Sequence, residues 1–585
     1  MTEKRNIKGS EVFLLSLLEE GVDTIFGYPG GAIMPLYDEL YDYTDRIRHI
    51  LVRHEQGAVH AAQGYARTCG RPGVCMATAG PGATNFVTGI ADAMLDSTPL
   101  VCITAQVGTE NLGSNFFQEA DMINITLPIT KWSYQITKAE EIPSVVAKAF
   151  HIASSGKPGP VVISFTKNAQ VEMTDFVYDR EKFLENVTRP LPKPSAGPSG
   201  DLAATVASMI NDSERPLILA GHGVIISGAA DALRELAEKS GAPVATTLLG
   251  LSCMPTDHPL YVGNAGMHGH LAPNRMTQKA DLIVAVGTRF SDRTTGVPAG
   301  YAPQAKIVHI EIDPTEIGRN VRADVAVNSD AWMALEAILS AGIKYRERTQ
   351  WLAFAAECAK EEDAVIRHRD FDGEVSGLGA AEAKDWIRMG QAVDAVARYA
   401  DPDAVIVSDV GQNQMFAARY SRFGEKGRWV TSGGLGTMGF GLPASVGAKI
   451  AAPGRQVIVF LGDGGLQMTI QELGTIHQTG AAVKIILLDN TYLGMVRQWQ
   501  ELFYDRRYSF THLVNPDFVS LVESYGIRAA RVTERDRLDE AVRELLECDG
   551  PAFLDVATDP GENVFPMVPA GASLDSIITG KEMSF

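Results

Sequence analysis

Cysteine is scarce in this chain of 585 residues. There are six, at positions 69, 75, 102, 253, 358 and 548, and no two are spaced as Cys-x-x-Cys. So few and so scattered, they exclude a disulfide scaffold. They are typical of a reduced, cytoplasmic protein.

The chain also lacks a long apolar run and an excess of positive charge. No apolar run reaches the ~18–20 residues that a membrane span needs. The short apolar stretch at residues 12–18 is followed by two glutamates, which favours a first amphipathic helix over a signal peptide. With 52 Lys and Arg against 71 Asp and Glu, the net charge of −19 disfavours nonspecific nucleic-acid binding. We therefore expect no membrane and no nucleic acid among the partners.

What is present is an ordinary globular composition in a chain too long for one hydrophobic core. Hydrophobic residues make up 45% and charged residues 21%. Residues 188–200 are dense in Pro, Gly and Ser, and residues 343–385 are charged and end in a Gly/Ala stretch; we interpret both as connections. The predicted domains are 1–187, 188–345 and 386–585, with a partly helical linker over 346–385.

Short β-branched runs alternate with longer amphipathic patterns between these connections. The runs occupy residues 161–164, 216–221, 281–287, 306–313, 404–409, 456–464 and 483–490. Continuous apolar strands separated by helices indicate parallel sheets buried on both faces. The predicted fold class is α/β, with three doubly wound parallel-sheet domains.

The most informative stretch is residues 456–490. A strand runs into a Gly-Asp-Gly-Gly sequence at 462–465, a helical spacing follows, and a second strand ends at Asp489-Asn490. Such a unit brings both strand ends to one edge of the sheet, so Asp463 and Asn490 lie side by side. The glycines admit a phosphate at the helix N-terminus, and a carboxylate with an amide oxygen suits Mg²⁺. The alternative is a plain strand-to-helix turn with a capping asparagine.

This arrangement resembles the thiamine-diphosphate-binding motif, GDG followed by Asn. The resemblance implies a metal site made by Asp463, Asn490 and Tyr492. Asp489 stands where the family often has a first asparagine. Because the second position holds the metal in the family, we expect this departure to be tolerated.

A second part of the resemblance lies near the N-terminus. Residues 53–67, between the glycine-rich segments 27–40 and 78–93, resemble the pyrimidine-binding domain of the same enzymes. There the residue matching Glu55 hydrogen-bonds the aminopyrimidine ring of the cofactor and activates it. Taken alone, Glu55 is equally typical of a solvated first-turn helix acid.

Within these enzymes the chain resembles the catalytic subunits of the acetolactate synthase (acetohydroxyacid synthase) family, from about residue 6 to 578. The carrying motifs are GMVRQWQELFY at 494–504 and FFQEADMINIT at 116–126. The resemblance implies that Trp499 shapes the pocket for a second 2-ketoacid. It further implies that the substrate is bordered by Gly31, Ala32, Phe117, Gln118 and Lys167. Taken alone, 494–504 is also typical of a core helix with an aromatic stripe.

The third domain also carries segments that resemble the cofactor cradle, at 408–415 and 433–444. Asn413 replaces a histidine common in the family, and an amide still donates a hydrogen bond. The implied thiamine diphosphate residues are Val410, Gln412, Asn413, Gly436, Met438, Gly462, Asp463, Gly464, Gly465 and Asn490.

The middle domain resembles the FAD-binding domain of the biosynthetic synthases. Its AGHGV turn at 220–224 is weak by itself, but it occurs with GMHGH at 266–270, GTRFSDRTTG at 287–296 and HIEID at 309–313. Glycines admit the pyrophosphate, Arg289 neutralises it, and Glu311 accepts from ribose or adenine. The implied FAD residues are Lys157, Gly221, Gly223, Met267, His268, Gly287, Arg289, Asp292, Glu311 and Asp324.

Two of these segments leave alternatives open. Arg293 can clamp a ketoacid carboxylate with two parallel bonds, or it is a solvated surface arginine. His268 is either a flavin neighbour or a core histidine. Lys157, Ser291 and the segment 164–168 depart from the family pattern, which predicts weaker FAD binding than usual.

The resemblance implies that pyruvate is decarboxylated and its two-carbon unit is ligated to pyruvate or 2-ketobutyrate, with the flavin in a structural role. It implies a homodimer in which Glu55 of one chain faces the Asp463–Asn490 site of the other, a separate small regulatory subunit, and a C-terminal lid at 564–578.

Four other functions remain open from the sequence. An oxidase of the pyruvate-oxidase type would reduce the flavin, and a non-catalytic scaffold would retain only the fold. The presence of Glu55, Asp463 and Asn490 disfavours the scaffold. Glyoxylate carboligases usually lack the activating glutamate, and the segment RFSDRTTG at 289–296 disfavours a flavin-free catabolic synthase.

Overall fold

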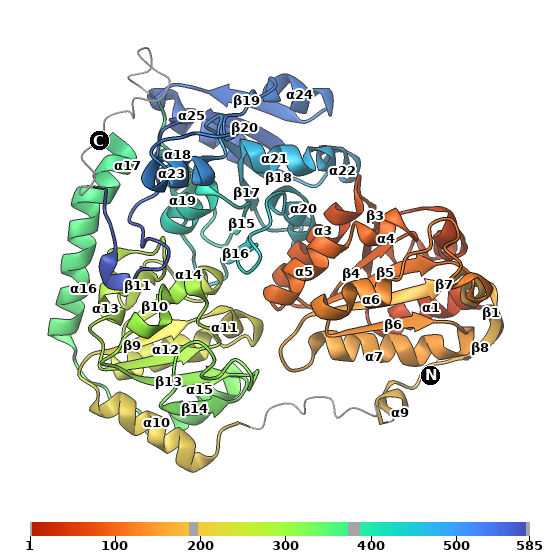
Figure 1. The fold of residues 1–585 in the computed structure, drawn as a ribbon, viewed down its shortest axis with the longest axis horizontal. Helices are drawn as coiled ribbons and strands as arrows, with labels where there is room; N and C mark the ends of the chain where they lie inside the picture. Colours follow the sequence, from red (N-terminus) through yellow and green to blue (C-terminus); the bar gives the residue numbers. More distant parts are fainter. Residues whose placement is uncertain (1–2, 186–196, 373–385, 581–585) are drawn as a thin grey trace.

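The computed structural model describes residues 3–185, 197–372 and 386–580. Within these ranges the chain forms three six-stranded sheets in which every neighbouring pair of strands is parallel. Helices cover the sheets on both sides (Figure 1). The predicted α/β fold class is confirmed.

The first sheet has the strand order β3-β2-β4-β5-β7-β6. Its strands are β2 (Thr24–Tyr28), β3 (Arg48–Leu51), β4 (Gly73–Ala77), β5 (Leu100–Gln106), β6 (Trp132–Ile136) and β7 (Pro160–Thr166). Its helices are α1 (Gly9–Glu19), α2 (Met34–Leu40), α3 (Glu55–Cys69), α4 (Pro81–Thr84), α5 (Val87–Leu95), α6 (Met122–Thr126), α7 (Ile142–Ser154), α8 (Lys167–Val171) and α9 (Arg180–Glu185). The N-terminal segment is thus the predicted helix, preceded by β1 (Glu3–Lys8), which pairs antiparallel with β8 (Met173–Val177).

The second sheet has the order β11-β10-β9-β12-β13-β14. Its strands are β9 (Pro216–Ala220), β10 (Val244–Thr246), β11 (Tyr261–Asn264), β12 (Leu282–Val286), β13 (Lys306–Glu311) and β14 (Val325–Asn328). Its helices are α10 (Gly200–Asp212), α11 (His222–Ile226), α12 (Ala230–Ser240), α13 (Leu271–Thr277), α14 (Asp292–Thr295) and α15 (Ala331–Ser340). The following connection is helical as far as it is described, with α16 (Thr349–Glu362), a π-helical turn at Asp363–Arg367 and α17 (His368–Asp372).

The third sheet has the order β16-β15-β17-β18-β20-β19. Its strands are β15 (Val405–Ser408), β16 (Arg428–Thr431), β17 (Val457–Gly462), β18 (Val483–Asp489), β19 (Arg528–Val532) and β20 (Ala552–Ala557). Its helices are α18 (Met389–Tyr399), α19 (Gln412–Tyr420), α20 (Gly441–Ala451), α21 (Asp463–Thr469), α22 (Leu473–Thr479), α23 (Gly494–Phe503), α24 (Phe518–Ser524) and α25 (Leu538–Glu547).

The seven predicted apolar runs all form strands: β7, β9, β12, β13, β15, β17 and β18. The helical spacing after the Gly-Asp-Gly-Gly sequence, by contrast, is divided between α21 and α22 by a 3₁₀ turn at Ile470–Glu472. The turn places the carboxylate of Glu472 against the first domain, where it accepts hydrogen bonds from the main-chain N–H groups of Arg53 and His54. A tertiary contact therefore interrupts a helix that the local pattern favoured.

The first and third domains pack together through helices α3 and α20 (Figure 1). A Cβ atom at Gly64 would lie 1.9 Å from the carbonyl oxygen of Ala444, and one at Gly447 would lie 1.8 Å from that of Ala61. Only glycine permits so close an approach of two helix backbones. Each helix therefore presents a glycine to the other at the crossing.

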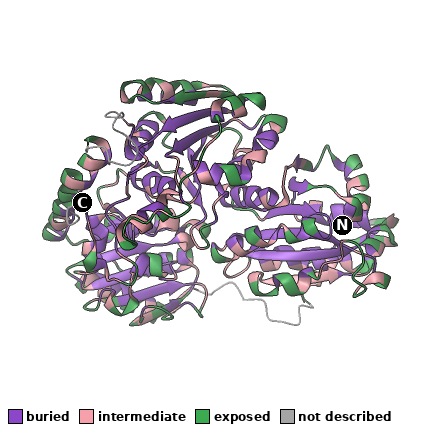
Figure 2. Cartoon of the chain, turned by 45° about the horizontal axis from the view of Figure 1, so that its top comes forward, coloured by how far each residue is buried: buried purple, intermediate pink, exposed green. Residues whose placement is uncertain are grey.

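The buried residues are concentrated in the sheets and in the helices that pack on them, as the colouring of Figure 2 shows. The C-terminal segment leaves the third domain and packs on the second, where Val568 and Leu574 join its apolar core. The main-chain N–H of Val568 donates to the carbonyl of Met267, and that of Val297 donates to the carbonyl of Ala572. No helix in the described ranges is long and apolar enough to cross a membrane.

Candidate functional site

The predicted phosphate and metal residues of the third domain surround a small cavity of about 60 Å³. β17 and β18 pair up to Gly462 and Leu488, so Asp463 and Asn490 follow two adjacent strand ends. The predicted residues that line this cavity are Val410, Gln412, Asn413, Met438, Gly462, Asp463, Gly464, Gly465, Asn490 and Tyr492.

The donor set suits a hard divalent cation. Asp463 accepts hydrogen bonds from the N–H of Gly464 (3.0 Å) and from Asn515 Nδ2 (2.7 Å). Burial, with the nearby charge of Asp489, raises the pKa of Asp463, so a bound cation would compensate a costly charge. No three His, Cys, Asp or Glu side chains converge on a metal-binding point in the described part of the chain. The amide of Asn490, main-chain carbonyls and phosphate oxygens would have to complete the Mg²⁺ shell.

The amide of Asn490 is already oriented by its neighbours. Its Nδ2 donates to Gln412 Oε1 (3.1 Å), and its Oδ1 accepts from the N–H of Tyr492 (3.1 Å). Thr491, between them, has a φ of +57°, which is unusual for a β-branched residue. The backbone after β18 is therefore held in a strained turn at the predicted metal site.

A loop of the third domain, residues 432–441, closes one side of this cavity. Gly436 (φ +72°) and Gly439 (φ +86°) adopt a left-handed backbone that favours glycine. Asp409, fully buried at the end of β15, accepts hydrogen bonds from the N–H groups of Val410, Gly439 and Gly441. Burial raises the pKa of Asp409 to about 6. This carboxylate fastens the loop beside the predicted phosphate site.

The first domain holds the same loop from the other side. Asp92 on α5 accepts hydrogen bonds from the hydroxyls of Ser432 and Thr437. Asp96, one turn later, accepts from the N–H groups of Gly433 (2.9 Å) and Gly434 (2.7 Å). Both carboxylates are buried. Three buried aspartates from two domains therefore set the shape of the loop.

A second cavity, of about 960 Å³, lies between the three domains. Val410, Gly411 and Met495 line both cavities, so the two adjoin. The predicted residues that line the large cavity are Lys157, Gly223, Met267, His268, Gly287, Arg289, Asp292, Arg293, Glu311, Val410, Gly436 and Trp499.

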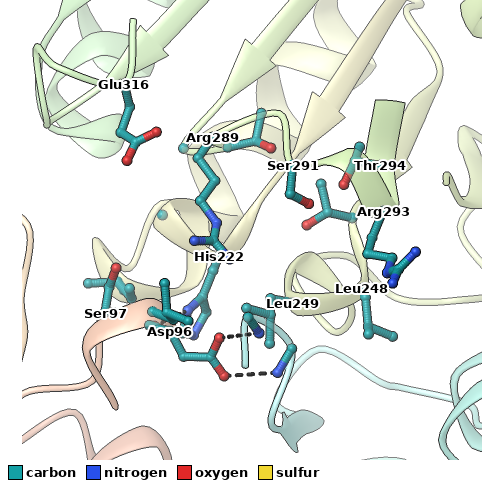
Figure 3. Close-up of a pocket in the computed structure, with 18 of the residues that line it drawn as sticks. Asp96, Ser97, His222, Leu248, Leu249, Arg289, Ser291, Arg293, Thr294 and Glu316 are labelled. Atoms are coloured by element: carbon teal, nitrogen blue, oxygen red, sulfur yellow. Dashed lines mark hydrogen bonds between the residues drawn. The ribbon is translucent and has the colours of Figure 1, made fainter. Parts of the chain in front are cut away.

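The large cavity fits a dinucleotide by its chemistry. A Cβ atom at Gly223 would lie 2.6 Å from Gly287 Cα, so the ends of β9 and β12 approach closely only because both residues are glycine. Arg289 forms no ion pair within the described ranges, which leaves its guanidinium for a phosphate (Figure 3). Glu311, at the end of β13, is nearly buried, and burial raises its pKa. Size, glycines, arginine and strand-end carboxylate agree with the predicted FAD site.

Two predicted flavin residues lie elsewhere. Gly221 packs against the carbonyl of Gly287, where a Cβ would lie at 2.2 Å, and it does not line the cavity. Asp324 is exposed, and its carboxylate accepts from the N–H of Ile307 at the start of β13. Their assignment to the flavin stays a prediction.

The other predicted residues of this cavity have distinct surroundings. Lys157, from the first domain, lies 3.4 Å from Glu316 and 3.7 Å from Asp313. The side chain of Arg293 is 61% exposed, and its nearest carboxylate is that of Asp292 at 3.8 Å. An arginine so loosely paired, in a cavity that Trp499 also lines, can receive a carboxylate ligand.

His268 is held in the cavity wall. Burial lowers its pKa to about 3, so the ring is neutral at pH 7. Its Nδ1 has no partner within the described residues, and its carbonyl accepts from Arg419. A neutral ring with an unpartnered nitrogen favours the interpretation as a ligand neighbour.

Apart from Lys157, the predicted residues of the first domain line neither cavity of their own chain: Gly31, Ala32, Glu55, Phe117, Gln118 and Lys167. Glu55 begins α3, and its carboxylate accepts from Asn85 Nδ2 (2.9 Å). Gln118 has a φ of +64° and lies against Gly80, so these segments do meet one another. The single chain thus carries two separate parts of the predicted site.

Glu472 anchors the start of α3. Its buried carboxylate accepts from the N–H groups of Arg53 and His54 (3.1 Å each) and from the hydroxyl of Thr475 (2.6 Å). Removing it leaves buried donors unsatisfied, at a cost of about 1–3 kcal/mol each. For Glu472→Ala we expect a melting temperature lowered by several degrees, measured by calorimetry. The exposed Glu523 of α24 gives the matched control, Glu523→Ala, and equal melting temperatures would contradict the role.

Sequence reasoning missed Asp92, Asp96, Asp409 and Glu472. Asp409 follows an apolar strand, and that strand-end position is a usable signal. The other three lie within or at the ends of helical segments, with partners more than 300 residues away in sequence. Only the packing of the first and third domains reveals them.

Comparison with known proteins matches all three domains. Residues 7–125, 203–338 and 409–556 match the N-terminal TPP binding, central, and C-terminal TPP binding domains of thiamine pyrophosphate enzymes. A probable acetolactate synthase large subunit of Methanocaldococcus jannaschii is 45% identical over 98% of this chain and 95% of its own length. The acetolactate synthase isozyme 2 large subunit of Escherichia coli is 41% identical over 97% of this chain and 98% of its own. The Lactococcus lactis large subunit is 41% identical over 97% and 96%.

Proposed function

Because the chain belongs to the acetolactate synthase large subunits, within the thiamine pyrophosphate enzymes, we propose that it makes acetolactate. In the proposed reaction pyruvate loses CO₂, and the remaining two-carbon unit is joined to a second 2-ketoacid. The acceptor is pyruvate or 2-ketobutyrate. The proposed cofactors are thiamine diphosphate, Mg²⁺ and FAD.

One observation carries the proposal. Arg293 and Trp499 line a cavity that adjoins, through Val410 and Met495, the pocket of Asp463 and Asn490. A carboxylate clamp and an apolar wall therefore border the predicted cofactor pocket. This is what a ligation to a second 2-ketoacid requires, because the acceptor must be held in a fixed orientation.

The residues have separable tasks in this proposal. The bound thiamine diphosphate supplies the carbon nucleophile and the electron sink. Glu55 holds or accepts a proton at the pyrimidine ring, and Asp463 with Asn490 would hold Mg²⁺ and the diphosphate. Arg293 binds the acceptor carboxylate, and Trp499 sets the space for its side chain. Arg289, Glu311 and Lys157 would hold the FAD.

A homodimer would join the two parts of the site. Apolar side chains near Gln118 and Lys167 are exposed on the single chain: Met34 (51%), Phe116 (54%), Phe117 (88%), Ile125 (40%), Leu127 (64%) and Val171 (51%). The third domain exposes another set outside both cavities: Met468 (55%), Phe503 (43%), Phe510 (99%) and Val514 (90%). Such exposure favours burial against a second copy. Glu55 would then act in the site of the partner chain.

We also propose a cellular location and a second subunit, each from one observation. All six cysteines are free, which supports a cytoplasmic location. The relatives are called large subunits, which supports the presence of a small regulatory subunit.

Product analysis tests the function. The protein is incubated with pyruvate, thiamine diphosphate, Mg²⁺ and FAD, and the products are separated while the flavin spectrum is followed. We expect acetolactate with oxidised flavin. Acetate or acetyl phosphate with flavin bleaching would instead identify an oxidase and refute the ligation.

Trp499 is expected to control the acceptor. Replacing it with leucine removes the aromatic wall, and one methylene in an apolar pocket is worth about 1–3 kcal/mol, or roughly 10–200-fold. With pyruvate and 2-ketobutyrate in competition, we expect the preference for 2-ketobutyrate to fall about tenfold in Trp499→Leu. The product ratio measures it. Trp332→Leu, which changes a half-exposed tryptophan outside both cavities, is the control; an unchanged ratio in Trp499→Leu would contradict the assignment.

A further inference from the structure

A chain of hydrogen bonds runs from the large cavity to the loop 432–441. It begins at His222, the first residue of α11, which lines the large cavity. His222 Nδ1 lies 3.0 Å from the main-chain oxygen of Asp96. A carbonyl oxygen only accepts, so Nδ1 carries the proton. Burial holds the pKa of His222 well below its ordinary value, so the ring is neutral and Nε2 is an acceptor.

Among the described residues nothing uses that acceptor: Nε2 makes no hydrogen bond there, and His222, though largely buried, lines the large cavity. In Figure 3 the side chain of Arg289 extends toward His222 and Asp96 in the same part of the cavity. A ligand there meets one cation and one neutral acceptor. This pair fits a phosphate beside a hydroxyl or ring N–H donor, as a dinucleotide supplies.

The chain continues through Asp96. Its carboxylate, fully buried, accepts from the N–H groups of Gly433 and Gly434, the bonds dashed in Figure 3. Arg67 Nη1 bridges this carboxylate (3.2 Å) and the carbonyl of Thr431 (2.7 Å). Asp96 thus binds His222 through its main-chain oxygen and the beginning of the loop through its carboxylate.

A second contact also joins the large cavity to the loop. A Cβ atom at Gly434 would lie 2.8 Å from both Arg289 Nη2 and Asp96 Oδ1. The loop therefore touches Arg289 directly, without an intervening side chain. Two residues later, Gly436 lines the large cavity, and Met438 lines the small one. A movement of the loop would therefore change the walls of both cavities.

We propose that His222 binds the ligand of the large cavity, accepting a hydrogen bond from a hydroxyl or ring N–H of a flavin dinucleotide. We further propose that His222 and Asp96 couple occupancy of that cavity to the affinity of the thiamine diphosphate pocket. This rests on the proposed function, in which the flavin undergoes no net redox change. The flavin then acts as a ligand that orders the loop, and His222 and Asp96 are positioning residues for it.

Equilibrium binding tests the coupling without measuring turnover. The dissociation constant of thiamine diphosphate, with Mg²⁺ present, is measured by tryptophan fluorescence on flavin-free and FAD-saturated protein. That of FAD is measured by flavin fluorescence with and without thiamine diphosphate. We expect each ligand to tighten the other by the same factor, about fivefold or more.

The variants separate the two residues. In His222→Phe we expect FAD binding to weaken several-fold and the coupling factor to fall below about two. His222→Gln, which keeps a donor for Asp96 and an acceptor for the ligand, should recover most of both. Asp96→Asn keeps its main-chain oxygen, so FAD binding should stay within about threefold while the coupling falls. His258→Phe changes a histidine that pairs with Glu238 and lines neither cavity, and should match the parent.

Each contrary result has its own meaning. FAD binding with a coupling factor of one in the parent would overturn the link and leave the proposed function standing. If His222→Phe kept the coupling factor of the parent, the proposed role of His222 in the coupling would be wrong. Failure of the parent to bind FAD would overturn both this inference and the flavin assignment, while acetolactate formation would still be decided by product analysis.

Discussion

Replacing Glu55 with glutamine is expected to lower the rate of acetolactate formation by about two to four orders of magnitude. An amide cannot hold or release the proton that a carboxylate exchanges with the pyrimidine ring. The fold should be kept, because an amide oxygen can still accept the hydrogen bond from Asn85. Initial rates at saturating pyruvate measure the effect, beside the dissociation constant of thiamine diphosphate, which we expect to change less than about tenfold.

The control for Glu55 is a glutamate of the same domain without a site role. Glu181 is exposed on α9, and Glu181→Gln should retain the parent rate. If Glu55→Gln retained even a tenth of the parent rate, general acid–base work by this carboxylate would be excluded.

The second large effect is expected at Asp463. Among the described residues, Asp463 is the only carboxylate that lines the predicted metal pocket. For Asp463→Asn we expect the affinity for thiamine diphosphate with Mg²⁺ to fall by about two orders of magnitude or more. The cofactor-free protein should be no less stable, because one of two neighbouring buried carboxylates becomes neutral. Titration followed by tryptophan fluorescence measures the affinity. The control is Asn515→Ala, which removes an amide that donates to Asp463 and Asp489 but keeps both carboxylates.

Mixing the two inactive variants tests where Glu55 acts. If Glu55 serves the partner chain, a heterodimer of Glu55→Gln and Asp463→Asn chains has one site with both defects and one intact site. Random exchange makes half the dimers mixed, so about a quarter of the parent activity should return. If each site used residues of its own chain, no activity would return.

The sequence predicted the fold where the pattern was local. Apolar runs separated by helical spacings are decided within a few residues, and β17, α21 and β18 follow that pattern to Asp463 and Asn490. The helix after Asp463 was predicted too long, because the contact of Glu472 with Arg53 and His54 has no local signal. Residues 186–196, which overlap the predicted connection 188–200, and 373–385, inside the other connection, lie outside the described residues.

For the candidate site, too, the sequence predicted the residues that follow a local pattern and not those that depend on domain packing. Asp463 and Asn490, predicted from their type and spacing, follow two adjacent strand ends and line one cavity, and their role there stays a prediction. Gly221 and Asp324, also predicted for the flavin, do not line the large cavity and instead contact Gly287 and Ile307 of the second domain. The predicted lid at 564–578 is packed, with Val568 bonded to Met267, so any opening must break these contacts. The contacts of His222 and Asp96 join residues of all three domains, so no local signal in the sequence points to them.

The packing of α3 and α5 against the third domain has a consequence for biosynthesis. Asp92 meets Ser432 only 340 positions later in the chain, and Arg53 meets Glu472 419 positions later. At a synthesis rate of about 5–20 residues per second, roughly 20–70 s pass before residue 432 follows residue 92 from the ribosome. During that time the nascent first domain exposes the glycine face of α3 and two aspartates without their partners. This face of the first domain is therefore completed only after the third domain has been made.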